Sequence, residues 1–218
     1  MYHKSLYCIC QNIIFGEVDM KRHIFWSLVI IAIFIGTYYL SLPQSEQPKE
    51  HIIKSQKVAD TDKFYTIRKD EYIYKGGAHG STTTKWKTIV KENRKEINDK
   101  ILNQNIDAQF KQLIKQGLIA YFTSYLPQYG GREFDATKLA DEILIEADVN
   151  NLPLPKSLPF LTEKGVGFMY GQYEISSYAN GQPAFVIPYK LMFPYLSNEI
   201  KELIKELDKQ EKIEAILP

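Results

Sequence analysis

The pattern of apolar and charged residues divides the chain into an apolar run, a polar stretch and a longer region of mixed character. The run extends from Ile24 to Leu42, carries no charge, and contains eleven Ile, Leu, Phe or Val residues. A helix of this length would extend about 28 Å, close to the thickness of the hydrocarbon core of a bilayer. Aromatic rings lie near its two ends, as in membrane helices (Trp26, Tyr38 and Tyr39). The pattern predicts one N-terminal transmembrane helix over residues 24–42.

Two other interpretations of this run remain open. A buried core helix can be apolar, but rarely over about 18 residues without a charge. A cleaved signal peptide has a shorter apolar segment and a small-residue cleavage site, whereas this run ends in Tyr-Tyr-Leu-Ser-Leu-Pro. We therefore expect an uncleaved signal anchor in the inner (cytoplasmic) membrane. Lys21 and Arg22 adjoin its N-terminal end, which favours a short cytoplasmic N-terminus, residues 1–23, and a periplasmic, extracytoplasmic C-terminal domain.

The residues before the run contain few further signals. Met20 followed by Lys21 and Arg22 has the form of a signal-sequence start, and we hypothesise that residues 1–19 are a mis-assigned start. Both cysteines, Cys8 and Cys10, precede the run, so the expected exported part would have no disulfide. A Cys-x-Cys pair with one nearby histidine is a weak metal signal, and we expect neither a metal site nor a cofactor.

Residues 43–62 are polar and contain two prolines, which predicts a solvated tether. Beyond it, short runs of strand-forming residues alternate with amphipathic segments. Strands are predicted at residues 64–67, 72–74, 81–90, 160–162, 166–175 and 184–187, and helices at residues 91–126 (with a break at 103–105), 136–148 (capped by Asp135) and 196–212. The predicted fold class is α+β, with a single domain over residues 63–212 in which antiparallel strands pack with helices.

Charge excludes one class of partner. The 176 residues after Leu42 hold 24 Lys and Arg and 24 Asp and Glu, so this part of the chain is neutral overall. It also lacks a basic block. Without such a block there is no electrostatic reason to expect a nucleic-acid partner.

Two stretches are less generic than the rest. The first reads Tyr-Lys-Gly-Gly-Ala-His-Gly over residues 74–80, and its glycines indicate positive φ or close backbone approach. The second reads Tyr-Glu-Ile-Ser-Ser-Tyr-Ala-Asn-Gly over residues 173–181, followed by Val-Ile-Pro-Tyr over residues 186–189. The structural residues of these motifs are Gly76, Gly77, Gly80, Gly181 and Pro188, and the candidate binding residues are His79, Tyr173, Glu174 and Tyr178.

Each candidate has a plain structural explanation beside the functional one. A histidine in a glycine-rich turn can act as a general base or ligand, but it also commonly bonds the backbone at the end of a strand. Tyr173, Tyr178 and Tyr189 are expected to form a core and rim cluster that doubles as a recognition face. Glu174 is expected at the surface or as a hydrogen-bond partner for the turn.

The two motifs, in this order and about a hundred residues apart, resemble a bacterial extracytoplasmic domain family of unknown function. The family is typified by the C-terminal domain of the anti-sigma factor RsiV and also occurs in the non-catalytic part of the peptidoglycan deacetylase PdaC. The resemblance covers roughly residues 64–207. It implies an α+β domain outside the membrane, on a single span or lipid anchor, that binds or senses near the cell wall and is not a catalyst.

We therefore expect a membrane-anchored binding or sensing domain of the cell envelope, not an enzyme, whose ligand is a cell-wall fragment or a protein. One alternative is a small envelope hydrolase that uses His79 with a serine or glutamate partner. The available partners in the sequence are Ser81, Ser176, Ser177 and Glu174. A second alternative is a scaffold or envelope-maintenance protein without a discrete ligand.

Overall fold

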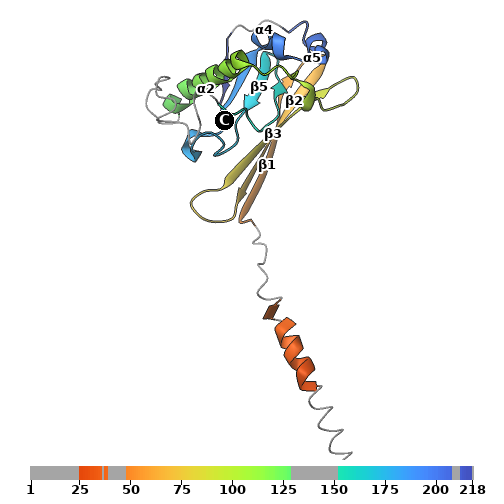
Figure 1. Ribbon diagram of the computed structural model, residues 1–218, viewed down its shortest axis with the longest axis vertical. Coiled ribbons are helices and arrows are strands. Elements are labelled where there is room, and N and C mark those ends of the chain that lie inside the picture. Colours follow the sequence, from red (N-terminus) through yellow and green to blue (C-terminus); the bar gives the residue numbers. More distant parts are fainter. Residues whose placement is uncertain (1–24, 36, 39–47, 129–151, 208–211, 218) are drawn as a thin grey trace, which may run out of the picture. The chain divides into compact units, whose positions relative to one another are not determined.

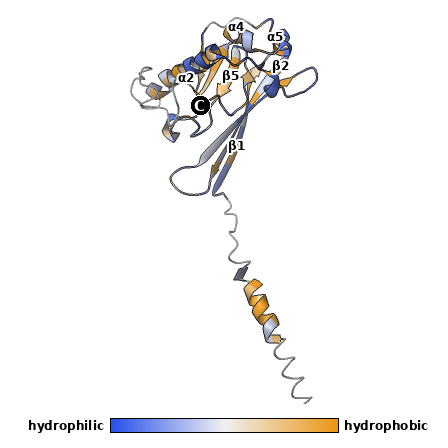
Figure 2. Cartoon of the chain, viewed as in Figure 1, coloured by the Kyte–Doolittle hydropathy of each residue, from blue (hydrophilic) through white to orange (hydrophobic). Residues whose placement is uncertain are grey.

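The computed structural model describes residues 25–35, 37–38, 48–128, 152–207 and 212–217. The chain divides into two compact units, Met1–Gln47 and Pro48–Pro218. In the first unit, residues 25–35 and 37–38 are helical and apolar along most of their length (Figure 2). Among the described residues, no helix is long and apolar enough to cross a membrane. Ile24, Gly36 and residues 39–42 of the predicted span lie outside the described part.

The second unit begins with a three-stranded antiparallel sheet in the order β1-β2-β3 (Figure 1). Its strands are β1 (Glu50–Asp60), β2 (Phe64–Tyr74) and β3 (Ser81–Val90). The predicted strand over residues 81–90 is confirmed, and its buried side chains alternate as a half-buried strand requires. The prediction of two short strands at 64–67 and 72–74 is wrong, because β2 is continuous. Its charged middle is paired on both sides, by β1 and by β3.

Residues 50–60 were expected to belong to a solvated tether, and instead they form β1. Ala59 is the single buried side chain among these eleven residues, so no apolar alternation marks the strand. Its stability comes from the backbone ladder with β2 and from cross-strand pairs such as His51 and Glu71, whose Nε2 and Oε1 atoms lie 2.7 Å apart. Because its side chains are mostly polar and exposed, this edge strand cannot be distinguished from a linker by its sequence.

A second antiparallel sheet has the order β4-β5-β6-β7. Its strands are β4 (Phe160–Leu161), β5 (Gly165–Met169), β6 (Ala184–Pro188) and β7 (Glu214–Ile216). The predicted strands at 160–162 and 166–175 pair with each other as β4 and β5, although β5 ends at Met169 and not at residue 175. The predicted strand at 184–187 is confirmed. All five side chains of β5 and of β6 are buried, so these strands form the centre of the core.

The main helix, α2 (Ala108–Gln128), packs against β6 and β7 (Figure 1). Its predicted apolar stripe is confirmed, with eight buried positions from Phe110 to Tyr125. The predicted helix over residues 91–107 is wrong, because Asp107 accepts a hydrogen bond from the Phe110 N–H and so caps α2 at that point. Ile97 and Ile101 are buried, but they lie beside the short 3₁₀ turn η1 (Asn98–Lys100).

The C-terminal region contains η3 (Tyr178–Asn180), α4 (Tyr189–Met192), η4 (Phe193–Tyr195) and α5 (Asn198–Leu203). The predicted helix over residues 196–212 is shorter, because α5 ends at Leu203; its start is set by Ser197, which caps it by accepting from the Ile200 N–H. The predicted helix at 136–148 and its cap Asp135 lie outside the described residues. The described part is thus α+β, with two antiparallel sheets and a few helices. Of the helix predicted over residues 91–126 with a break at 103–105, the part after the break is present as α2.

Candidate functional site

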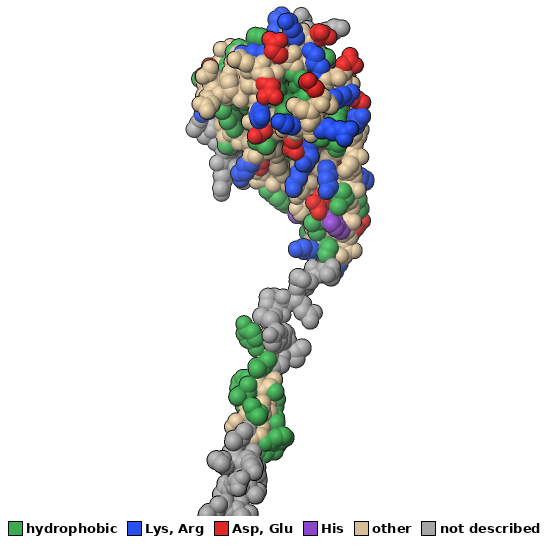
Figure 3. Space-filling view, turned by 90° about the vertical axis from the view of Figure 1, so that its right-hand side faces the viewer, with side chains coloured by type: hydrophobic (Ala, Val, Ile, Leu, Met, Phe, Trp, Pro, Cys, Tyr) green, Lys and Arg blue, Asp and Glu red, His purple; other side chains and the backbone are tan. Residues whose placement is uncertain are grey.

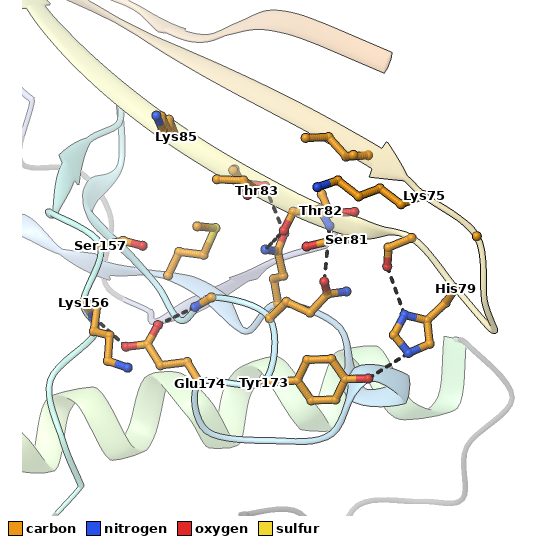
Figure 4. Close-up of a pocket in the computed structure, with 18 residues that line it drawn as sticks. Lys75, His79, Ser81, Thr82, Thr83, Lys85, Lys156, Ser157, Tyr173 and Glu174 are labelled. Atoms are coloured by element: carbon orange, nitrogen blue, oxygen red, sulfur yellow. Dashed lines mark hydrogen bonds between the residues drawn. The ribbon is translucent and has the colours of Figure 1, made fainter. Parts of the chain in front are cut away.

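An open cleft of about 950 Å³ lies between the first half of β3, residues 156–157 and the turn over residues 169–174 (Figure 4). Residues 75, 76, 79 and 80 of the first motif line one end of it. Residues 173 and 174 of the second motif line it as well. The fold therefore brings the two motifs to a single cavity, although about a hundred residues separate them in the chain.

The glycines of the first motif form the connection between β2 and β3. Gly76 has a φ of 112° and Gly77 a φ of 102°. Residues that carry a Cβ rarely adopt such positive φ angles. Gly80 allows a close approach, because a Cβ there would lie 2.4 Å from the ring of Tyr72 as it now stands. Both uses of glycine agree with the expectation from the sequence. This tight turn places His79 at the mouth of the cleft.

His79 is fixed by three contacts. Its Nδ1 lies 3.0 Å from the Gly80 carbonyl oxygen, which can only accept, so Nδ1 carries a proton. In the neutral imidazole, Nε2 then accepts from the Tyr173 hydroxyl at 2.9 Å (Figure 4). The ring also stacks on Tyr178, with centroids 4.1 Å apart. Three of the four candidate binding residues are therefore in direct contact.

Tyr173 adopts an unusual backbone conformation for its type. Its φ is 59°, which a residue with a bulky side chain rarely adopts and which costs free energy. Its side chain is also 53% exposed, although it is a large aromatic residue. Strained, exposed aromatic residues that line a cavity are concentrated at binding sites.

Glu174, the fourth candidate, holds this turn in place. Its Oε2 accepts from the Gly171 N–H at 2.6 Å, and its Oε1 accepts from the Lys156 N–H at 2.7 Å. Glu174 therefore bonds its own turn and residue 156, and not the glycine-rich turn for which it was a candidate partner. Since both carboxylate oxygens are bound to backbone groups, Glu174 positions Tyr173 and ties residue 156 to the cleft wall.

The remaining motif residues lie outside the cleft lining. Gly181 has a φ of 70°, and a Cβ there would lie 2.6 Å from the hydroxyl of Tyr121. Pro188 ends β6. Tyr189 is buried and donates to the Thr162 carbonyl at 2.6 Å, and this burial raises the pKa of Tyr189. Tyr189 is therefore a core residue.

The cleft is rich in hydrogen-bond donors and has a positive bias. Three lysines from different segments line it, namely Lys75, Lys85 and Lys156, and hydroxyl groups of residues 81–84 and 157 lie between them (Figure 4). Glu174 is the one acidic residue among the described residues of the lining. On the face shown in Figure 3, Lys and Arg side chains are interspersed with Asp and Glu.

Several lining residues were not identified from the sequence. Lys85 is one of the alternating exposed residues of β3, and Lys156 lies in a proline-rich connection. Each therefore resembles an ordinary solvated lysine. Gln172 and Gln182 both contact Thr82 across the cavity wall. An amide side chain beside a motif has no periodicity of its own, so nothing in the sequence marks these glutamines.

The contacts of His79 do not form a catalytic constellation. Neither ring nitrogen contacts a carboxylate or a serine of the described residues; the partners are a backbone carbonyl and a phenol. Ser176 is buried, and its hydroxyl has no partner in the described part. The described residues also contain no cluster of three His, Cys, Asp or Glu able to hold a metal, while His3, Cys8 and Cys10 lie outside them.

Residues 83–190 match the family model described as "Protein of unknown function (DUF3298)". The match includes the second motif and begins just after the first. A crystal structure of a DUF3298 family protein from Pseudomonas aeruginosa is similar over 76% of this chain and 70% of that chain, with a TM-score of 0.50 and 18% identity. Another, from Bacteroides fragilis, is similar over 94% and 74%, with a TM-score of 0.52 and 19% identity. These two likenesses concern the fold. No curated protein matches the chain.

Proposed function

We propose, from the DUF3298 domain at residues 83–190 and the cleft that it lines, that this chain is a binding or sensing protein of the cell envelope. In this proposal the apolar run Ile24–Leu42 anchors the chain in the inner membrane, and unit Pro48–Pro218 is extracytoplasmic. The domain is not an enzyme. Its ligand is a cell-wall fragment or a protein, and it is related to the C-terminal domain of RsiV and the non-catalytic part of PdaC.

The observation that supports binding most directly is the state of His79. Its two ring nitrogens are bonded to Gly80 and Tyr173, and its face is covered by Tyr178. A general base needs a nucleophile within reach and an orienting acid, and neither is found among the described contacts of this ring. A fixed aromatic group beside donor-rich walls is instead suited to ligand recognition.

The proposed anchoring rests on the composition of the apolar run. The described helical residues 25–35 and 37–38 have exposed apolar side chains, including Phe25, Ile31 and Phe34 at 61%, 53% and 70%. Burying such side chains is worth about 1.5–3 kcal/mol each. A bilayer would supply that burial.

Protease added to intact spheroplasts tests the location. Digestion of residues 48–218 before lysis supports the proposal, and protection until lysis contradicts it. Capture from envelope extract then tests binding, with the wild-type chain compared with a Lys85→Gln, Lys156→Gln double variant. A component retained by the wild type and lost from the variant supports ligand binding in the cleft. Equal retention by both would contradict it.

The alternative hydrolase is distinguished by His79→Ala. Loss of a measured hydrolytic activity from envelope substrates, with the circular dichroism spectrum unchanged, would favour the enzyme. Under the binding proposal, the wild-type chain shows no such activity for the substitution to remove.

A further inference from the structure

The outward edge of β3 forms part of the cleft, and amide side chains complete its hydrogen bonds at one end. The Thr82 N–H donates to Gln172 Oε1 at 3.2 Å, and the Thr82 carbonyl accepts from Gln182 Nε2 at 3.2 Å. Both backbone groups of Thr82 therefore point away from β2. Two glutamine side chains take the place that a neighbouring strand would occupy.

An amide side chain also bonds to the outward backbone groups of β3 further along the strand. The Thr88 N–H donates to Asn98 Oδ1 at 2.7 Å, and the Trp86 carbonyl accepts from Asn98 Nδ2 at 3.2 Å. One buried amide thus supplies both an acceptor and a donor to the strand edge, as a peptide group does. Thr82, Trp86 and Thr88 are separated by even numbers of residues. Their backbone N–H and C=O groups therefore face the same side of β3, because alternate residues of an antiparallel strand direct these groups to one side.

Between these two positions the described residues leave the backbone of the edge unpaired. Thr84 has the same parity, so its N–H and C=O face outward, and the Trp86 N–H does so as well. Among the described residues, no hydrogen-bond partner is found for these three backbone groups. Thr84 lines the main cleft, and Trp86 lines an adjoining cavity of about 250 Å³ that shares four lining residues with it. An unpaired strand edge in a cavity is a template for an added strand.

Charge indicates which kind of strand would bind. Lys75, Lys85 and Lys156 line the cleft, and none of them forms an ion pair with a described residue. The single negative charge of Glu174 balances only one of these three positive charges, and its oxygens are directed to two backbone N–H groups. Carboxylates on a bound segment would complement the three ammonium groups.

We propose that the cleft binds an extended peptide segment with carboxylate side chains, which pairs with the backbone of Thr84 and Trp86 and directs its carboxylates to Lys75, Lys85 and Lys156. This inference rests on the proposed binding function and specifies its ligand class. The peptide backbone supplies affinity, and the lysines select acidic sequences.

The probe is a fluorescein-labelled, amidated hexapeptide of sequence Thr-Glu-Val-Glu-Val-Thr, titrated against the full chain in detergent and followed by anisotropy. Replacing both glutamates by lysine should weaken binding at least about tenfold, since attraction becomes repulsion. N-methylation of the amides along one edge of the peptide should weaken binding by about fivefold per hydrogen bond, whereas the other edge should tolerate it. The amide resonances of Thr84 and Trp86 should shift on titration.

Two matched proline variants test the backbone contact from the protein side. Thr84→Pro removes an outward N–H and no backbone bond to β2, as edge positions tolerate. It also removes the Thr84 hydroxyl, which bonds to Asp70 and Gln182. Ser55→Pro makes the same change on the outward edge of β1, away from the cleft lining. Binding should fall at least about fivefold in the first variant and stay unchanged in the second. If Thr84→Pro does not fold, the methylated peptides and the amide shifts still decide.

An acidic oligosaccharide, oligogalacturonate, separates failure of this inference from failure of the proposed function. If it binds in a Lys85-dependent manner while the peptide does not, the cleft is a binding site but the peptide inference is overturned. Equal affinity for the acidic and lysine peptides, or tolerance of N-methylation along both edges, also overturns it. Edge-dependent loss together with selectivity for glutamate supports it.

Discussion

Replacement of Asn98 by alanine should destabilise the second unit strongly. Asn98 is 1% exposed and makes three hydrogen bonds, to the Thr88 N–H at 2.7 Å, the Trp86 carbonyl at 3.2 Å and the Pro159 carbonyl at 2.7 Å. It therefore joins β3 to the segment that enters β4. Alanine would leave three backbone groups without this partner, at about 1 kcal/mol each, so we expect a loss of about 3 kcal/mol in the free energy of unfolding.

Urea unfolding measures this loss. The chain has two tryptophans, so a Trp26→Phe background isolates the fluorescence of Trp86, which lies next to the substituted site. With an m-value of about 2 kcal/mol/M, the midpoint should fall by about 1.5 M while m stays constant.

The matched control is Asn93→Ala, at an exposed turn where Oδ1 accepts from the Lys95 N–H. It should change stability by less than about 0.5 kcal/mol. If Asn98→Ala costs no more than this control, the amide does not act as a strand substitute, and the reasoning on the β3 edge is refuted.

Three further predictions concern packing, backbone strain and pH. Gly117→Ala should destabilise α2 by about 1–3 kcal/mol despite its better helix propensity, because the new Cβ would lie 2.1 Å from the Phe185 ring; an unchanged melting temperature would contradict this. Tyr173→Gly should be more stable than Tyr173→Ala by about 1 kcal/mol, since only alanine retains the cost of positive φ; equal stability in urea would show that the backbone is unstrained. The hydrogen bond from the Phe110 N–H is the main factor that lowers the pKa of Asp107 in the folded state. Its contribution is therefore present above the unfolded pKa and lost as pH falls through the folded pKa, so the melting temperatures of wild type and Asp107→Asn should converge from pH 6 to pH 2, and a constant difference would contradict the assignment.

Periodicity predicted those elements whose side chains face the core. The stripe of α2 and the alternation of β3 are examples, because burial on one face leaves a regular apolar pattern. The prediction was wrong where residues with helical apolar spacing are buried by a different local structure. Ile97 and Ile101 are four residues apart and both buried, yet η1 and not a long helix places them in the core. β1 left no apolar pattern at all, because its stability lies in backbone pairing.

The candidate site could be predicted only in part, for related reasons. The glycines and aromatic residues of the two motifs are rare enough to be noticed, and His79, Tyr173 and Tyr178 do meet. The lysines that give the cleft its charge lie at positions where any solvated lysine would be expected. The open edge at Thr84 is a property of the backbone, and side-chain pattern carries no information about it.

The most direct test of a ligand-binding cleft is site-specific photo-cross-linking in the native cells. A benzophenone amino acid replaces Tyr173, which is exposed in the cleft, and in a second strain it replaces Phe193, which is 50% exposed and absent from the cleft lining. We predict a discrete adduct from position 173 that is lost with Lys85→Gln and Lys156→Gln, and none of that mass from position 193. Equal labelling from both positions, or no adduct from position 173, would contradict the account.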